Sequence, residues 1–283
     1  MINNCLIILN YNDVDTTRKL VEIVKEYQTI DKIIIVDNCS TDMSYSILKS
    51  YQSEKIDVII TDENRGYASG NNKGAFYSIK KYNPKVLFFA NPDVAFKESA
   101  ISAMSEVLLR EKKIAIIAPK VKEGYNIWNL PMYWGTIRSL FLILFTLHKR
   151  KVARSMEKDI EEVGVVEGSF FAIKSEIFKK INGFDERTFL YLEENILAQK
   201  ILREGYTEAV LTKVYYLHEH SKSIKKEYHS KTNAFRLFKP SYYIYLKYYL
   251  NCNNIQIILF DLCYFIGFLE RIVYDLVDRL KMK

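Results

Sequence analysis

Residues 32–42 read KIIIVDNCSTD, a run of aliphatic residues that ends in a polar cluster. A strand that is apolar on both faces is typical of a parallel sheet with helices on both sides. Similar short runs recur through the first 120 residues, with amphipathic helical segments between them. The sequence therefore predicts an α/β domain with right-handed crossovers, whose function lies at the carboxyl ends of the strands. The expected strands are Cys5–Leu9, Lys32–Val36, Asp57–Thr61, Val86–Ala90 and Ile114–Ala118.

The composition favours a globular protein with a small anionic ligand. The chain has 283 residues, 49% of them hydrophobic, so it can bury a core and is neither a disordered tail nor a fibrous repeat. Its 41 Lys and Arg against 34 Asp and Glu give a net charge of +7, which favours anionic small molecules or a lipid surface over nucleic acid. The four cysteines form no CxxC pair, and the first apolar run is too short for a secretory signal. We therefore expect reduced thiols in the cytoplasm.

Polar clusters follow four of the expected strands. Because the carboxyl ends of parallel strands meet at one edge of a sheet, we expect the clusters to form one site. No GxGxxG follows the first strand and no GxxxxGK[ST] occurs, which disfavours dinucleotide oxidoreductases and P-loop NTPases. The clusters are Asn10-Tyr11-Asn12, DNCSTD (37–42), ENRGYASGNNKG (63–74) and NPD (91–93).

Several residues of these clusters suit a nucleotide diphosphate. Asp93 comes just after the apolar run VLFFA and can hold a divalent cation against a diphosphate, although Asn-Pro-Asp is also a common turn. Asp37 stands at a strand end, where a carboxylate can accept from a nucleobase imide or a ribose hydroxyl. Gly66 permits a tight turn and Arg65 offers charge to a phosphate, while a solvent-exposed loop explains the same residues equally well.

The second half of the chain is less regular. We expect a core domain over residues 1–234 with an irregular insertion at about 120–162, and a helical extension over 235–283. The apolar stretch 255–269 contains Gln256 and Asp261, so it falls short of a membrane span. The stretch 139–147 is followed by four basic residues, which suits a helix lying in a membrane interface. Core packing or a homodimer explains both stretches equally well.

Six motifs, in order from Leu6 to Lys226, resemble the family 2 glycosyltransferases with a GT-A fold, nearest to their rhamnosyltransferase-like branch. The fold class that this implies is a Rossmann-like, mostly parallel central sheet flanked by helices, with a C-terminal helical appendage. The motifs are NYN, VDNCSTD, ENRGYASGNNKG, NPDV, VEGSFFAIKSEIFKKINGFDERTFLYLEEN and HEHSKS.

The resemblance implies a role for each matching residue. Asp93 corresponds to the acid that binds Mg²⁺ or Mn²⁺ on the diphosphate, with Asn91 in place of the first acid of the common DxD form, and His218 to a late histidine that helps to hold the metal. Asp37 corresponds to the nucleobase-binding acid. Gly168, Asp185 and Glu186 correspond to positions on the acceptor side. Those expected to bind the nucleotide are Asn10, Tyr11, Asn12, Asp37, Asn38, Asn64, Arg65, Gly66, Asn71, Asn91 and Asp93.

The segment FLYLEEN resembles the family's acidic pair at a helix start, which makes Glu194 the expected catalytic base and Glu193 the alternative. Acids are also common in the first turn of any helix. The branch usually has Asp at the position of Glu194 and a further acid where this chain has Ile196, so the identity of the base stays open. One base and one metal suffice for a single displacement that inverts the anomeric centre.

These features predict an inverting, metal-dependent transferase. The expected donor is dTDP-rhamnose or a UDP-hexose, and the expected acceptor is a surface polysaccharide or a polyprenyl-diphosphate-linked glycan at the cytoplasmic face of the membrane. One alternative is a sugar nucleotidyltransferase, which needs a glycine- and arginine-rich loop straight after the first strand, where this chain has NYND (10–13). The other is a silent scaffold that binds sugar or nucleotide without catalysis.

Overall fold

The structure is a computed structural model that describes residues 3–142, 158–219 and 231–281. Two short strands of these residues, β7 (Ile127–Trp128) and β9 (Val165–Val166), pair with each other. Nine others form one mostly parallel sheet. They are β1 (Asn4–Asn10), β2 (Lys32–Asp37), β3 (Ile56–Ile60), β4 (Val86–Ala90), β5 (Val94–Phe96), β6 (Ile114–Val121), β8 (Ile160–Val163), β10 (Phe170–Lys174) and β11 (Thr207–His218).

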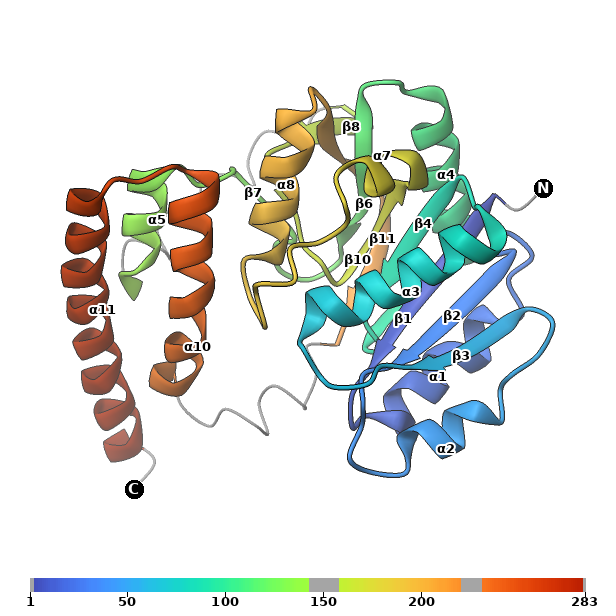
Figure 1. Cartoon of the computed structure of the whole chain (residues 1–283), viewed down its shortest axis with the longest axis horizontal. Helices are drawn as coiled ribbons and strands as arrows, with labels where there is room; N and C mark the ends of the chain where they lie inside the picture. The colour runs from blue at the N-terminus through green and yellow to red at the C-terminus, as the bar shows by residue number, and fades with distance from the viewer. Residues whose placement is uncertain (1–2, 143–157, 220–230, 282–283) are drawn as a thin grey trace.

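The sheet has the order β3-β2-β1-β4-β10-β6-β11-β5, and β8 also pairs with β11 (Figure 1). Strands β1 to β4 run parallel to one another, with Ile7 opposite Ile34 and Phe89. Strand β10 runs antiparallel between β4 and β6. The five strands expected in the first 120 residues are all present, with ends shifted by at most three residues, so the predicted α/β sheet is confirmed.

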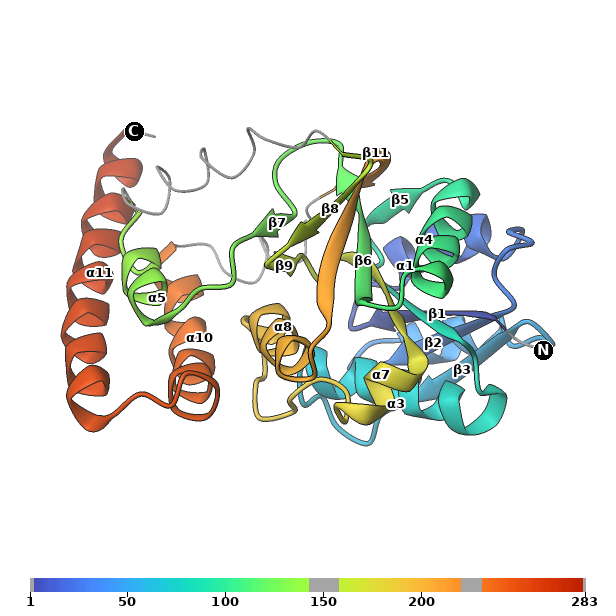
Figure 2. The same cartoon turned by 90° about the horizontal axis from the view of Figure 1, so that it is seen from above.

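Helices cover both faces of the sheet because its central strands β1, β2, β4 and β10 are apolar on both faces (Figures 1 and 2). Leu6 and Ile33 lie in one core, whereas their chain neighbours Ile7 and Ile34 lie in the other. The first core is closed by α1 (Val14–Val24), α2 (Ser44–Lys49) and α4 (Glu98–Arg110). The second is closed by α3 (Tyr67–Tyr82), α7 (Ser175–Lys180) and α8 (Glu193–Arg203).

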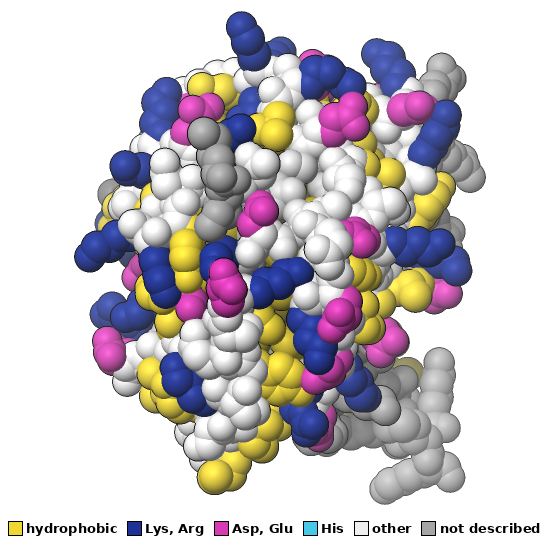
Figure 3. Space-filling model, turned by 90° about the vertical axis from the view of Figure 1, so that its right-hand side faces the viewer, with side chains coloured by type: hydrophobic (Ala, Val, Ile, Leu, Met, Phe, Trp, Pro, Cys, Tyr) yellow, Lys and Arg dark blue, Asp and Glu magenta, His cyan; other side chains and the backbone are white. Residues whose placement is uncertain are grey.

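A helical appendage packs beside this domain. It consists of α5 (Tyr133–Ser139), α10 (Lys231–Ile244), the π-helical turn η1 (Tyr245–Tyr249) and α11 (Asn254–Lys281), around a third apolar cluster. None of the helices in the described ranges combines the length and the apolarity that crossing a bilayer requires. The end of the molecule opposite α11 shows interspersed positive and negative side chains, as a solvated surface does (Figure 3).

The segment 120–162 was expected to be irregular, but its described parts contain β7, α5 and β8. The hydroxyl of Tyr133 in α5 donates to the carbonyl of Gln256 in α11 at 2.8 Å. Leu140, in the stretch expected to lie in a membrane interface, is fully buried against the appendage. Long-range packing of this kind has no periodicity signal in a seven-residue helix. The rest of that stretch, from residue 143, lies outside the described residues.

Candidate active site

The carboxyl ends of β1 and β2 are joined by buried hydrogen bonds. The Asn10 amide donates to Asp37 Oδ2 at 2.9 Å, and Asp37 also accepts from the backbone N–H and the hydroxyl of Ser40, both at 2.8 Å. Asn10 Oδ1 in turn accepts from the Thr17 hydroxyl at 2.7 Å. Asn10 and Asp37 have no exposed surface, so both residues fix the shape of this edge. Contact of Asp37 with a nucleobase stays a prediction.

The neighbouring NYN residues leave one aromatic ring accessible. Asn12 adopts a left-handed conformation, with φ of 50°, and its side chain accepts from the backbone N–H of Thr41 at 2.8 Å. Its backbone N–H donates to the Ser40 hydroxyl at 2.9 Å. Tyr11 is 39% exposed, so its ring can stack against a base. The loops after β1 and β2 therefore form one rigid rim with Tyr11 at its surface.

A second group of polar residues ties the end of β2 to the start of α3. The Asn38 amide donates to Asn64 Oδ1 at 2.9 Å and to the carbonyl of Gly66 at 3.2 Å. Asn71 is buried one turn into α3, and its amide donates to the Tyr67 carbonyl at 3.1 Å. Arg65 differs from these residues, because its side chain is 63% exposed and pairs only at the surface with Glu63.

Gly66 lets α3 begin against a distant loop. Its φ is +94°, and an added Cβ would lie 1.9 Å from the carbonyl oxygen of Phe189. The next residue, Tyr67, donates its backbone N–H to that same oxygen at 3.0 Å. The start of α3 is therefore held to the segment that leads into α8.

Replacing Gly66 by Ala is expected to lower the free energy of unfolding by about 3 kcal/mol or more, because a left-handed alanine and a backbone clash add together. The matched control is Gly124→Ala, since Gly124 has a φ of +96° and nothing within 4 Å of its added Cβ. This control should cost only about 1–2 kcal/mol. Denaturant unfolding measures both values, and equal costs would contradict the close approach to Phe189.

The NPD cluster forms a turn and also delivers a carboxylate to the site. Asn91 donates its backbone N–H to the Ser169 carbonyl at 2.8 Å, and the chain turns directly into β5. Strand β5 pairs with the end of β11, where Val94 lies opposite His218. This pairing places Asp93 Oδ2 3.4 Å from His218 Nε2. The turn interpretation and the site interpretation are therefore both compatible with the same three residues.

Glu167 is a third member of this group that the sequence analysis did not assign. Its Oε1 lies 3.7 Å from His218 Nδ1, on the side of the ring away from Asp93. Burial alone would lower the pKa of His218, but the two carboxylates outweigh burial and raise it to about 9. Glu167 stands inside the VEGSFF motif, but nothing in its spacing from Asp93 could indicate that the two converge on one histidine.

The residues present fit a hard cation that is shared with a diphosphate. In the described ranges, no three His, Cys, Asp or Glu side chains form a complete metal-binding cluster. Mg²⁺ commonly takes only one or two protein carboxylates and completes its shell with phosphates and water. Two adjacent ligands of an octahedral ion lie about 3 Å apart, close to the 3.4 Å between Asp93 and His218.

The two acids at the start of α8 have different surroundings. They follow Tyr191 and Leu192, whose φ values of 74° and 67° form a strained left-handed turn. Glu193 is 4% exposed and faces the backbone N–H groups of this turn, while its Oε1 has no hydrogen-bond partner among the residues that the structure describes. Burial, followed by the nearby charge of Glu194, raises the pKa of Glu193 to about 8. The carboxyl of Glu193 therefore belongs to the turn.

Glu194 faces the other side, towards the VEGSFF segment. Its Oε1 accepts the backbone N–H of Gly168 at 3.2 Å, and the hydroxyl of Tyr67 donates to the Gly168 carbonyl at 2.7 Å. Glu194 is partly exposed. Burial is the main cause that raises its pKa above the ordinary range, and the charge of Glu167 adds to it. Ile196, where the branch has an acid, is fully buried.

Asp93 and Glu194 are connected through one short segment. Glu167 contacts the histidine that also contacts Asp93, and the next residue, Gly168, donates to Glu194. Two side chains a hundred residues apart are thus linked by a chain of contacts through His218, the Glu167 side chain and the backbone N–H of Gly168. An added Cβ at Gly168 would lie 2.9 Å from Glu194 Oε1, so a glycine lets the carboxylate approach this segment.

Glu208 of β11 is a further buried acid beside this segment, and no motif in the sequence indicates it. Its Oε2 accepts the backbone N–H of Val166 at 2.8 Å. Burial raises the pKa of Glu208 from 4.5 to about 8, with a smaller effect from Glu194. Glu208 binds its proton more tightly in the folded state than in the unfolded chain. Its contribution to the free energy of unfolding is therefore fully present below pH 4.5 and is lost as the pH rises through 8.

Replacing Glu208 by Gln is expected to remove this loss, since the amide oxygen still accepts from Val166 and carries no charge. Each pKa unit corresponds to about 1.4 kcal/mol, and each kcal/mol to about 2–4 °C in melting temperature for a chain of this size. The variant should melt several degrees above the wild type at pH 9 and at the same temperature near pH 4. Thermal melts at both pH values measure this difference. If the melting temperatures of the two proteins changed equally with pH, the raised pKa of Glu208 would be contradicted.

The acceptor-side residues are held by the appendage. The Asn72 amide donates to Glu186 at 2.9 Å, and the Tyr249 hydroxyl donates to Asp185 at 2.7 Å. Burial raises the pKa of Asp185, but hydrogen bonds from Arg187 and Tyr249 outweigh it and lower the pKa to about 2. The Arg187 guanidinium lies 4.1 Å from the ring centre of Tyr248. The turn η1 therefore fixes the loop that precedes α8.

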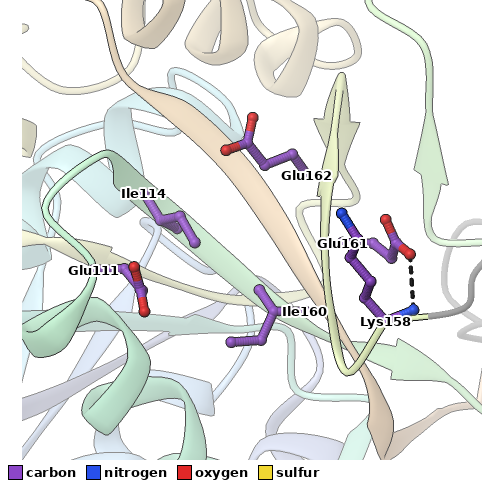
Figure 4. Close-up of a pocket in the computed structure, with 6 residues that line it drawn as sticks. All are labelled: Glu111, Ile114, Lys158, Ile160, Glu161 and Glu162. Atoms are coloured by element: carbon purple, nitrogen blue, oxygen red, sulfur yellow. Dashed lines mark hydrogen bonds between the residues drawn. The ribbon is translucent and has the colours of Figure 1, made fainter.

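Two surface hollows lie apart from Asp93 and Glu194. One of about 560 Å³ is lined by residues of α3, α8 and the acceptor-side loop, including Arg65, Glu186 and Lys200. The other, of about 450 Å³, lies at β8 and includes Glu111, Ile160 and Glu162 (Figure 4). The first hollow thus adjoins two of the three expected acceptor-side residues, and the second contains no predicted site residue.

A family model described as glycosyl transferase family 2 matches residues 5–182, which is more than half of the chain. The chain belongs to the family 2 glycosyltransferases. Its matched segment contains every predicted nucleotide-binding residue and Asp93, whereas the Glu193-Glu194 pair and His218 lie beyond it.

Curated relatives of this glycosyltransferase carry related names. It is 26% identical over 204 residues to the low-salt glycan biosynthesis hexosyltransferase Agl10 of Haloferax volcanii, covering 71% of this chain and 62% of that protein. It is 25% identical over 206 residues to the rhamnosyltransferase WbbL of Escherichia coli, covering 71% of this chain and 77% of that protein. It is 22% identical over 212 residues to an N-acetylglucosaminyl-diphospho-decaprenol L-rhamnosyltransferase of Mycobacterium tuberculosis, covering 69% and 68%.

Solved structures show the same GT-A fold. The mannosyltransferase PcManGT of Pyrobaculum calidifontis, in complex with GDP-Man and Mn²⁺, matches with a TM-score of 0.56 and 13% identity. This match covers 84% of the family 2 chain and 64% of that chain. Staphylococcus aureus TarS 1-349 in complex with UDP-GlcNAc matches with a TM-score of 0.56 and 14% identity, covering 84% and 65%. The chain thus spans slightly less than two thirds of both structures.

Proposed function

We propose that this glycosyltransferase moves a sugar from a nucleotide-diphosphate donor to a hydroxyl of a surface polysaccharide or a lipid-linked glycan, with inversion. The observation that carries the proposal is the connection from Asp93 through His218 and Glu167 to Glu194. Relatives named rhamnosyltransferases favour dTDP-rhamnose, and a relative named a hexosyltransferase favours a UDP-hexose. The relative named for diphospho-decaprenol supports a polyprenyl-linked acceptor at the cytoplasmic face of the membrane.

In this proposal Glu194 is the general base. Its carboxylate removes the proton of the acceptor hydroxyl as that oxygen forms a bond to the anomeric carbon. The bond from this carbon to the diphosphate breaks, and its electrons leave with the nucleoside diphosphate. The Gly168 N–H holds Glu194 in place, and Tyr67 holds the carbonyl of Gly168. A single displacement inverts the centre, so no second carboxylate nucleophile is needed.

Asp93 and His218 would hold the Mg²⁺ or Mn²⁺ ion, which when bound neutralises charge on the departing diphosphate. The rim formed by Asn10, Asp37 and Asn12 positions Tyr11 for the nucleobase, and the exposed guanidinium of Arg65 is available to a phosphate. The raised pKa of Glu194 suits a base that must take a proton near neutral pH.

A panel of UDP-, dTDP- and GDP-sugars tests the proposal, with donor hydrolysis and transfer measured in the presence of Mn²⁺. Turnover of one of these donors is the expected result. Calorimetry with UDP and dTDP distinguishes the alternatives. Nucleotide binding without turnover of any donor would favour a silent scaffold, and release of pyrophosphate from a nucleoside triphosphate and a sugar phosphate would favour a nucleotidyltransferase.

A further inference from the structure

The outer face of α11 is apolar, and no other element of the described residues covers it. Nine apolar side chains between Ile255 and Val277, among them Ile258, Leu262 and Phe265, are 45% to 78% exposed. At 100° per residue they fall within an arc of about 120°, along about 34 Å of helix. Soluble proteins rarely leave a continuous apolar surface of this kind open to water. The opposite side of the same helix packs on α5 and α10.

No charged residue falls within this arc. Asp261 and Glu270 lie just beyond its two edges, and both are engaged by the appendage. Lys239 lies 3.1 Å from Asp261 Oδ1, and the backbone N–H of Leu142 donates to Glu270 at 2.9 Å. A helix that pairs with a second helix usually carries charges at the edges of its seam to set register and orientation. Here the two edge acids, Asp261 and Glu270, are already engaged within the appendage, and the arc is wider than such a seam.

The helix α5, which packs beside α11, exposes side chains suited to a lipid interface. Trp134 is 63% exposed and Met132 is 64% exposed, next to the residue that bonds the first turn of α11. Arg138, one turn further along α5, is also exposed. Tryptophan and arginine beside an apolar face are typical of helices that lie in the headgroup region of a bilayer.

We propose that the outer face of α11, with Met132 and Trp134 of α5, is a docking surface that lies on a lipid bilayer. The inference rests on the proposed function in one respect, since a lipid-linked acceptor has to be reached at a membrane. The appendage that docks is also bonded to the catalytic domain, because Ser241 of α10 donates to the Leu190 carbonyl at 3.0 Å and Tyr249 to Asp185. Docking would therefore place the acceptor-side loop at the membrane.

Vesicle flotation with the full chain tests this proposal. The wild type is expected to float with phosphatidylethanolamine/phosphatidylglycerol vesicles, and binding should persist at about 1 M salt, where charges are screened beyond about 3 Å. The variant Ile258→Ser/Leu262→Ser/Phe265→Ser should bind at least about tenfold more weakly. The control variant Ile23→Ser/Ile60→Ser/Leu109→Ser removes three side chains of the catalytic domain that are 39% to 52% exposed, and it should float like the wild type.

Two further measurements make the outcome decisive. Circular dichroism confirms that each variant is folded, and sedimentation without lipid reports the oligomeric state. A wild type that does not bind vesicles would overturn the proposal. So would a wild-type dimer that the α11 substitutions split without changing flotation, because the apolar face would then bind a second copy of the chain. Flotation does not depend on catalysis, so Glu194→Gln should float normally, and failure of the proposed function would be seen separately.

Discussion

Replacing Glu194 by Gln is expected to slow sugar transfer by about 10²–10⁴-fold, because the amide cannot take the acceptor proton. The substitution keeps the size of the side chain and an oxygen that can accept from Gly168. The affinity for the nucleotide should therefore stay unchanged. Initial rates with the donor found in the panel, together with calorimetry on the nucleoside diphosphate, measure the two effects.

Glu193→Gln is the matched control for this prediction. The carboxyl of Glu193 is buried at the Tyr191–Leu192 turn and does not reach Gly168, so its loss should reduce the rate by less than about tenfold. The rate of the wild type should rise with pH as Glu194 loses its proton, and this rise should be absent in Glu194→Gln. If Glu193→Gln transferred sugar slowly and Glu194→Gln kept the wild-type rate, Glu193 would be the base instead of Glu194.

Replacing Asp93 by Asn is expected to weaken Mn²⁺-dependent nucleotide binding by about 10²-fold and to reduce turnover at least as much, because the cation loses its carboxylate. Binding measured with a chelator present should not change. Asp159→Asn is the control, since Asp159 is an exposed acid that pairs with Lys213 at the surface. Equal Mn²⁺ dependence in the wild type and in Asp93→Asn would exclude Asp93 as a ligand.

Much of the catalytic domain could be predicted from its sequence because local rules govern it. Residues such as Ile33–Val36 are apolar on both faces, and the parallel sheet follows from that pattern alone. The first turn of α8 at Glu193 is likewise where the acidic residues indicated it. The appendage was less visible, since α5 is held by distant residues such as Gln256 and has no long apolar period of its own.

From the sequence, the site could be predicted only as separate polar clusters, each at the end of one strand. Asp37 and Asn10 look like ligand-binding residues in the sequence, but the fold uses both to bond one loop to another. Glu208 lies in no motif, and Glu167 lies in one that gives it no role, because the significance of both comes from the pairing of β11 with β5 and β8. Convergence of this kind depends on strand order across the sheet, which spacing along the chain does not contain.

The most direct test is a crystal structure with Mn²⁺ and the nucleotide sugar that the panel identifies, in the slow Glu194→Gln variant. We expect anomalous scattering from Mn²⁺ at about 2.2 Å from Asp93 and His218, with the diphosphate bound to the ion. The anomeric carbon should lie between the ion and residue 194. A nucleotide bound elsewhere, or an ion that does not touch Asp93, would contradict it.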